Sequence, residues 1–201
     1  MMPNQPSSWP QSIWSYLTRR GESGRTATEL YGRVVAQARA PWFYSDLGVP
    51  DQPEGRLEIV LLHVTLVLAR LKAEGAGAEP LARALAEAFV TDMDDCLREM
   101  GVGDQTVAKK VKKAAAALFD RCRDYTAALA SATDDDLVRL TAAHLVEAGN
   151  GAGAAALAAY ARASSRRLAG IDAADLSAGR VEFAEQPSSP GPPVRGSLAD
   201  N

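Results

Sequence analysis

The chain has 201 residues and a formal net charge of −3, with 47% hydrophobic and 23% charged residues. This length suits one domain with its own hydrophobic core. The modest net charge excludes a protein that binds nucleic acid or an anionic membrane over its whole surface, so basic recognition must be local. Cys96 and Cys122 lack CxxC spacing and neighbouring histidines, which argues against a disulfide framework and a zinc site.

The sequence shows no targeting or membrane-spanning segment. The N-terminal residues lack the basic and apolar regions of a secretory signal. The most apolar stretch, 59–71, is interrupted by polar residues and is shorter than the ~20 residues of a membrane span. We therefore expect a bacterial cytoplasmic protein, and peripheral contact with the inner face of the membrane stays open.

Apolar residues three and four apart predict an all-α fold, a single compact bundle of six to seven helices. We expect helices over residues 9–20, 26–38, 53–74, 79–100 and 104–129, a sixth from 133 to the Gly149–Gly151 break, and a seventh from there to 168. Residues 1–24 would form the short first helix and a flexible lead, residues 25–170 the helical domain, and residues 171–201 a disordered tail rich in Pro, Gly and Ser.

Local sequence signals predict where several helices begin and end. Thr26 and Glu29 form a capping-box pattern, and Pro41 ends the helix that this pattern begins. The helix over 53–74 is apolar nearly all round, so it should lie at the centre of the bundle. Gly101 suits a left-handed C-cap, and Asp104 suits the next N-cap.

The chain offers little for catalysis, because its only histidines are His63 and His144. Both lie on apolar helical faces and are expected to be hydrogen-bonded core histidines, with a ligand or base as the alternative. No GxxxxGK[ST] phosphate loop occurs, and the GNGAGAA segment at Gly149 follows no predicted strand. We expect neither enzymatic activity nor a bound cofactor or metal.

Three sequence features are candidates for partner binding. Trp42, Phe43 and Tyr44 are consecutive aromatic residues in a short loop, and at least one of them should be exposed. Asp92 shares a helical sector with Leu81 and Leu85. It must therefore be paired, with an arginine or His63, or line a binding groove.

The third feature is a basic face, formed by Lys109, Lys110, Lys112 and Lys113. These lysines fall opposite an apolar stripe that runs from Val107 to Leu129 within about 80° of a helical wheel. They are either a solvated face or a docking surface for an acidic partner, ribosomal RNA or lipid head groups.

The order of these segments resembles the ubiquinol–cytochrome c chaperone family. The similarity is carried by LYGRVVAQARAPWFYSDLGVPD, GRLEIVLLHVTLVLARL and AFVTDMDDCLREMGVGDQTVAKKVKKAAAALFDR, which cover about Leu30 to Leu129. Order, spacing and the REMGVGD-to-KKVKK junction all agree. The first twenty residues and everything after about Ser131 lie outside the similarity.

The resemblance implies a non-enzymatic assembly factor for respiratory complex III that binds newly made cytochrome b. It also implies a small partner protein and contact with the ribosome. Within that interpretation, the aromatic loop and Asp92 become a candidate client surface, and the four lysines a candidate surface for the ribosome or the membrane. The alternative is a helical adaptor that binds nucleic acid or an acidic partner through the lysines, although the alanine-rich face beside them does not favour base readout of DNA.

Overall fold

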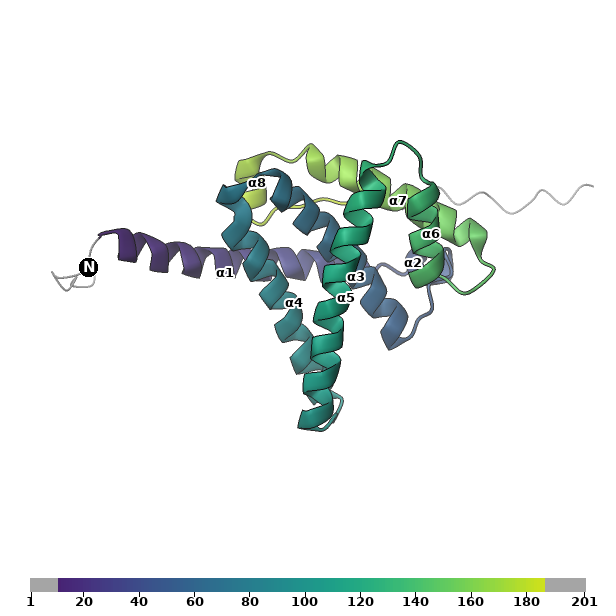
Figure 1. Cartoon of the computed structure of the whole chain (residues 1–201), viewed down its shortest axis with the longest axis horizontal. Coiled ribbons are helices and arrows are strands. Elements are labelled where there is room, and N and C mark those ends of the chain that lie inside the picture. Colours follow the sequence, from purple (N-terminus) through teal and green to yellow (C-terminus); the bar gives the residue numbers. More distant parts are fainter. Residues whose placement is uncertain (1–10, 187–201) are drawn as a thin grey trace, which may run out of the picture.

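A computed structural model describes the backbone of residues 11–186 and the side chains of residues 23–186 (Figure 1). The helices are α1 (Gln11–Ala38), α2 (Trp42–Ser45), α3 (Pro53–Ala73), α4 (Glu79–Glu99), α5 (Asp104–Ala130), α6 (Asp135–His144), α7 (Gly151–Ala169) and α8 (Ala173–Ser177), with a 3-10 turn over Ala76–Ala78. Residues 11–186 contain no strand, so the all-α prediction is confirmed. None of the helices within this range could cross a bilayer.

Helix α3 lies at the centre of the bundle, as its apolar sequence predicts. It packs against α1, α4, α5 and α7. Its buried side chains point to all sides of the helix: Ile59, Leu61, Leu62, His63, Val64, Thr65, Leu66, Val67 and Leu71. The other long helices each bury one stripe against it, which is the usual arrangement of helices around a single core.

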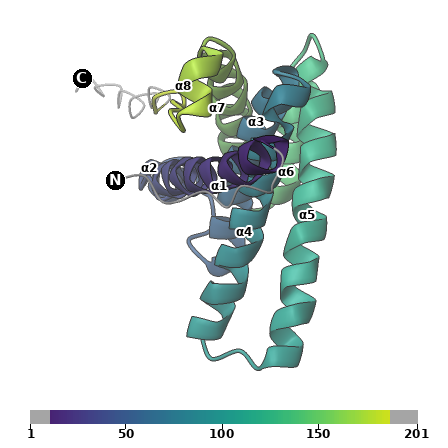
Figure 2. The ribbon, with the colours of Figure 1, turned by 90° about the vertical axis from the view of Figure 1, so that its left-hand side faces the viewer.

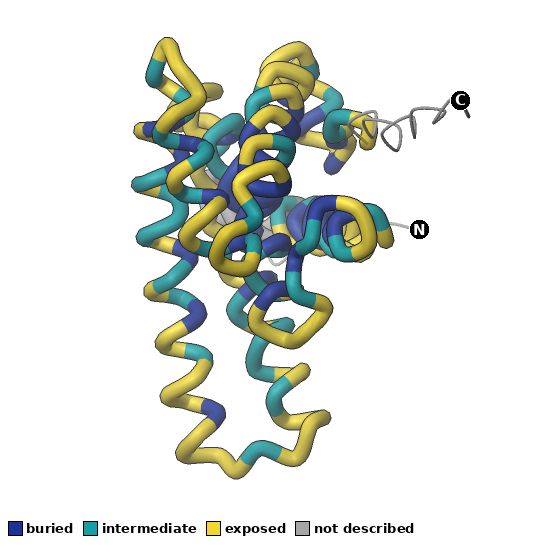
Figure 3. Tube along the Cα trace, turned by 90° about the vertical axis from the view of Figure 1, so that its right-hand side faces the viewer, coloured by how far each residue is buried: buried dark blue, intermediate teal, exposed yellow. Residues whose placement is uncertain are grey.

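Helices α4 and α5 form an antiparallel hairpin whose far end projects beyond the rest of the bundle (Figures 1 and 2). Most residues at this end are exposed, whereas buried residues gather where the hairpin meets the other helices (Figure 3). Gly101 has a φ of +74°, and the Val102 N–H donates to the Leu97 carbonyl at 3.1 Å, which confirms the predicted C-cap. Asp104 is not the N-cap, because that position is Gly103. Its carboxylate instead accepts from Arg98 at 2.6 Å.

The predicted break between a short first helix and the helix starting at Thr26 is absent. Helix α1 is continuous from Gln11, so the Thr26 capping box does not form, and residues 11–24 are not a flexible lead. No proline occurs in this stretch, and each of the glycines Gly21 and Gly24 costs a helix only about 1 kcal/mol. The predicted start at Trp9 lies outside the described residues.

The predicted disordered tail is wrong for residues 171–186. After α8, residues 178 and 179 form a turn, and residues 180–186 follow without regular secondary structure; we call residues 178–186 the C-terminal strap. Val181 is buried, Phe183 packs on the core, and the Ala184 N–H donates to the Ser164 hydroxyl at 3.1 Å. The Gln186 amide donates to Asp46 at 2.7 Å, which ties the strap to the loop after α2. Residues 187–201 lie outside the described part of the chain.

The entry to α3 requires a glycine. A Cβ at Gly55 would lie 2.1 Å from the Pro50 carbonyl oxygen, whereas a Cβ at Gly32, on the exposed face of α1, would meet nothing within 4 Å. We expect Gly55→Ala to lower the free energy of unfolding by about 1–3 kcal/mol, and Gly32→Ala to raise it by up to about 1 kcal/mol. Urea denaturation of the two variants measures both changes. Equal stability of the two would contradict the close approach.

Candidate functional site

The three consecutive aromatic residues form the short helix α2, and they do not face the same way. Phe43 is fully buried, whereas Trp42 and Tyr44 are half-buried. The Trp42 ring meets Tyr160 edge-on at 5.1 Å between centroids. The Tyr44 hydroxyl donates to the Ala38 carbonyl at 2.7 Å. None of the three is fully exposed, and Phe43 is unavailable to a partner because it belongs to the core.

His63 holds α2 in this position. Its Nδ1 lies 2.7 Å from the Ile59 carbonyl, which can only accept, so Nδ1 carries the proton. Nε2 therefore accepts from the Tyr160 hydroxyl, also at 2.7 Å, and the Tyr160 oxygen accepts from Gln37 at 3.1 Å. Phe43 meets the imidazole edge-on at 5.4 Å. Burial lowers the pKa of His63 to about 4, so the ring is neutral. His63 is thus the hydrogen-bonded core histidine that the sequence predicts.

A recess opens beside the exposed edge of Tyr44. It has a volume of about 590 Å³ and is lined by Arg39, Pro41, Tyr44, Ser45, Asp51 and Arg56. The Arg56 guanidinium lies 5.8 Å from the centre of the Tyr44 ring and forms an ion pair with Asp51 at 2.6 Å. Arg39 forms no ion pair with any residue that the structure describes, so one cationic group at the recess remains available.

Asp92 is paired, as the structural alternative predicts, but with an unexpected partner. Its carboxylate accepts from the Tyr31 hydroxyl of α1 at 2.7 Å, and neither an arginine nor His63 contacts it in the described part of the chain. Burial and then the hydrogen bond to Asp92 raise the pKa of Tyr31, while the charge of Arg39 opposes this. Burial likewise raises the pKa of Tyr44, and Arg39 again opposes the change. Tyr31 and Tyr44 therefore lie within electrostatic reach of the same arginine.

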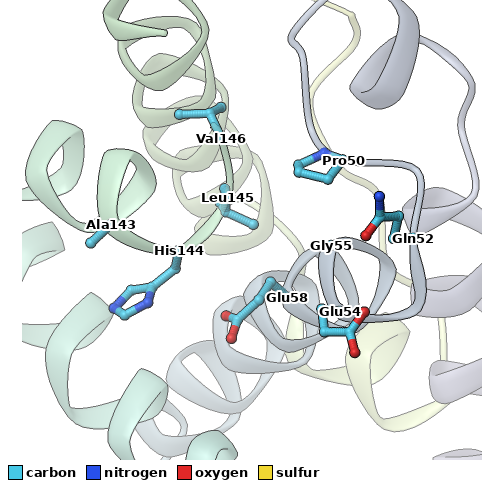
Figure 4. Close-up of a pocket in the computed structure, with 9 residues that line it drawn as sticks. All are labelled: Pro50, Gln52, Glu54, Gly55, Glu58, Ala143, His144, Leu145 and Val146. Carbon is cyan, nitrogen blue, oxygen red and sulfur yellow. The ribbon is translucent and has the colours of Figure 1, made fainter. Parts of the chain in front are cut away.

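A second recess, of about 400 Å³, lies between the start of α3 and the end of α6 (Figure 4). Glu58 and His144 line it from opposite sides. Arg121 donates to both Glu58 oxygens at 2.9 Å and to His144 Nδ1 at 2.9 Å. Burial and the charge of Arg121 lower the pKa of His144, so the acceptor is a neutral ring. Arg121 already pairs with the Glu58 carboxylate and the His144 imidazole. We therefore interpret this recess as a structural feature and not as a binding site.

The four lysines form a surface of their own. Lys109, Lys110, Lys112 and Lys113 are all exposed and lie on the first half of α5, in the projecting end of the hairpin. Among the described side chains, none of these lysines forms an ion pair with an acidic residue of α4. The ion pairs at this end of the hairpin are made by Arg98, with Asp94 of α4 and Asp104 of α5. The structure thus places Tyr31, the partner of Asp92, and Tyr44 near one arginine, whereas the lysines lie on a different helix.

Sequence reasoning missed the two arginines of the Tyr44 recess. Arg39 directly follows α1 and Arg56 lies in the first turn of α3, and neither belongs to a run of basic residues in the sequence. Only the turn through Pro41 and Pro50 brings them to the two sides of Tyr44. Within the described residues, no group of three His, Cys, Asp or Glu side chains could hold a metal ion. The arrangement favours binding through an aromatic edge and a free guanidinium.

Comparison with known proteins gives the family. The sequence model described as "Ubiquinol-cytochrome C chaperone" matches residues 45–183, from the last residue of α2 to Phe183 in the C-terminal strap. The chain belongs to this family. It is also similar to a solved structure, the Cbp3 homolog from Brucella abortus, at 32% identity and a TM-score of 0.74. That match covers 86% of this chain and 97% of the Brucella chain. The comparison with curated proteins found no match.

The family match extends further towards the C-terminus than the similarity drawn from the sequence. Helices α6, α7 and α8 and most of the strap fall within it, although the sequence motifs end at Leu129. This agrees with the packing, because Tyr160 of α7 and Phe183 of the strap both contact His63. The C-terminal third therefore belongs to the same folded unit of the chaperone family.

The buried imidazole of His63 makes the fold sensitive to acid. Its pKa falls from 6.5 to about 4 on folding, so the unfolded chain takes up a proton first and stability is lost as the pH falls from about 6.5 towards 4. We expect this group to remove about 2 kcal/mol of the free energy of unfolding between pH 7 and pH 4.5. Urea denaturation at both pH values should show a smaller loss for His63→Gln than for the unchanged chain. Equal losses would mean that His63 is not buried in its neutral form.

Proposed function

We propose that this chain is a non-enzymatic assembly chaperone that binds newly made cytochrome b and promotes assembly of the ubiquinol–cytochrome c reductase. The observation that carries the proposal is the family match over residues 45–183, together with a likeness to the Brucella Cbp3 homolog across 86% of the chain. Cytochrome b is an apolar, polytopic client that needs protection between its synthesis and its assembly. A chaperone bound to it in that interval would leave the finished complex.

The mechanism that we propose needs only binding energy. A folded surface that fits one conformer of the client raises the population of that conformer by its differential affinity. The recess beside Tyr44 suits this role, because Phe43 and His63 fix its wall before any client arrives. A preformed surface loses little conformational entropy on binding, which favours affinity.

We propose that the client contacts are made by Trp42, Tyr44, Arg39 and Arg56. Tyr44 offers an amphipathic ring edge of the kind that anchors protein interfaces. Arg39, free of an ion pair within the described chain, can donate to a carboxylate or to the carbonyl oxygens at a helix C-terminus of the client. Asp92 takes a supporting role, since its bond to Tyr31 links α4 to α1, the helix that leads into the recess. Phe43 is excluded because it is buried.

The finer features of the proposal concern place and partners. We propose that the chain meets cytochrome b at the inner face of the membrane, close to the ribosome that makes it, with a small partner protein as in other members of the family. The lysine surface of α5 is separate from the recess, so contact with the ribosome or membrane leaves the recess open to the client.

Capture of cytochrome b tests the proposal. Tagged chain isolated from respiring cells in mild detergent should recover cytochrome b without the other subunits of the mature reductase. We expect Arg39→Ala combined with Tyr44→Ala to reduce recovery at least about tenfold, because one hot-spot side chain contributes about 2 kcal/mol.

Arg33→Ala is the matched control, since Arg33 is an exposed arginine on the same helix outside the Tyr44 recess. It should leave the recovery unchanged. Recovery of cytochrome b that is equal for all variants would reject the recess as the client site. Absence of cytochrome b from every eluate would reject the proposed client itself.

A further inference from the structure

Helix α5 carries an exposed aromatic residue that the fold does not use. Among the residues with described side chains, the large hydrophobic residues left exposed are Phe119, at 74%, and Met100, at 60%. Met100 lies at the end of α4 next to the Gly101 turn, where exposure is common. Phe119 lies in the middle of a 27-residue helix, on its outer side. Its position requires a separate explanation.

Phe119 lies on the same side of α5 as three of the four lysines. At ~100° per residue, it falls within about 20° of Lys112, about 80° of Lys109 and about 120° of Lys113. Lys110 lies about 180° away and belongs to the opposite edge of the exposed surface. The outer face of α5, defined here as Lys109, Lys112, Lys113 and Phe119, thus combines an exposed ring with cationic groups that form no ion pair within the described chain.

This face is presented by a fixed helix. Its opposite side is buried through Val107, Ala114, Leu118 and Tyr125, which pack α5 onto the rest of the fold. Helix α5 also forms an outer edge of the molecule, and its N-terminal half, together with the end of α4, extends past the other helices (Figure 2). A large flat partner can therefore reach the whole face without a change in the fold.

We propose that the outer face of α5 docks on an anionic lipid bilayer, with Phe119 entering the headgroup region and Lys109, Lys112 and Lys113 contacting lipid phosphates. The charge distribution supports this occupant. Helix α5 contains six basic and three acidic residues, whereas the whole chain carries a net charge of −3. Basic residues around an apolar anchor are the combination that holds proteins to anionic membrane surfaces.

Other polyanions fit this face less well. Single-stranded nucleic acid is bound in basic grooves lined by several stacking residues, whereas this face is convex and has one ring. Base readout would require several Arg, Asn or Gln side chains beside the lysines, whereas the first half of α5 carries one, Gln105, and alanines at positions 108, 115 and 116. Because this face is separate from the Tyr44 recess, the inference holds whether or not cytochrome b is the client.

Vesicle sedimentation tests the inference with the purified full chain. The chain should pellet with vesicles of phosphatidylcholine that contain one third phosphatidylglycerol, and much less with phosphatidylcholine alone. Raising the salt concentration to about 0.5 M should release it, because the Debye length falls well below 10 Å. Each Lys→Gln change at positions 109, 112 or 113 should weaken binding about fivefold. Phe119→Ser should weaken it about tenfold.

Lys72→Gln and Met100→Ser are matched controls, because these residues are exposed but lie outside the face. Both should bind as the unchanged chain does, and circular dichroism should show the same helix content for all variants. Equal binding to neutral and anionic vesicles, or full binding by Phe119→Ser and the lysine variants, would overturn the inference. Binding to a ribosomal RNA fragment without any binding to anionic vesicles would also overturn it.

Discussion

Helix α3 carries an imidazole into the centre of the bundle, and the surrounding elements are arranged so that both of its ring nitrogens have a partner. Leaving such a group without hydrogen bonds would cost roughly 1–3 kcal/mol, a large share of the stability of a small domain. Ile59 supplies one partner from the same helix, and Tyr160 supplies the other from α7. Phe43 from α2 and Phe183 from the strap then enclose the ring. Five parts of the chain are positioned by this contact, because Gln37 of α1 also bonds to Tyr160.

The same contact separates the buried and accessible parts of the aromatic segment. Once Phe43 is fixed against His63, the neighbouring Tyr44 emerges between the end of α1 and the start of α3. Arg39, directly after α1, and Arg56, in the first turn of α3, line the recess together with Tyr44. The position of the lysine-bearing α4–α5 hairpin is determined instead by the buried apolar stripe of α5 and by the turn at Gly101. The chain therefore presents two surfaces of different chemistry on one folded domain: an aromatic and arginine-lined recess, and a basic helix face.

The sequence predicts most of this fold, because helix periodicity and glycine or proline boundaries are local signals. The central position of α3, the buried stripe of α5 and the turn at Gly101 all follow from such signals. The continuity of α1 was missed because a capping pattern at Thr26 suggests a helix start even inside a helix. The strap was missed because its order comes from contacts of Val181 and Phe183 with distant residues, which composition does not reveal. The recess could not be predicted for the same reason, since Arg39 and Arg56 meet Tyr44 only through the path of the loops.

We propose that the Tyr44 recess contacts cytochrome b during assembly of the reductase. Site-specific photo-crosslinking in respiring cells tests it directly, with a photoreactive amino acid placed at position 45, within the recess, or at position 33, on α1 outside it. We expect a crosslink to cytochrome b from position 45 and none from position 33. Crosslinks from position 45 that contain only other proteins, or equal crosslinks to cytochrome b from both positions, would contradict it.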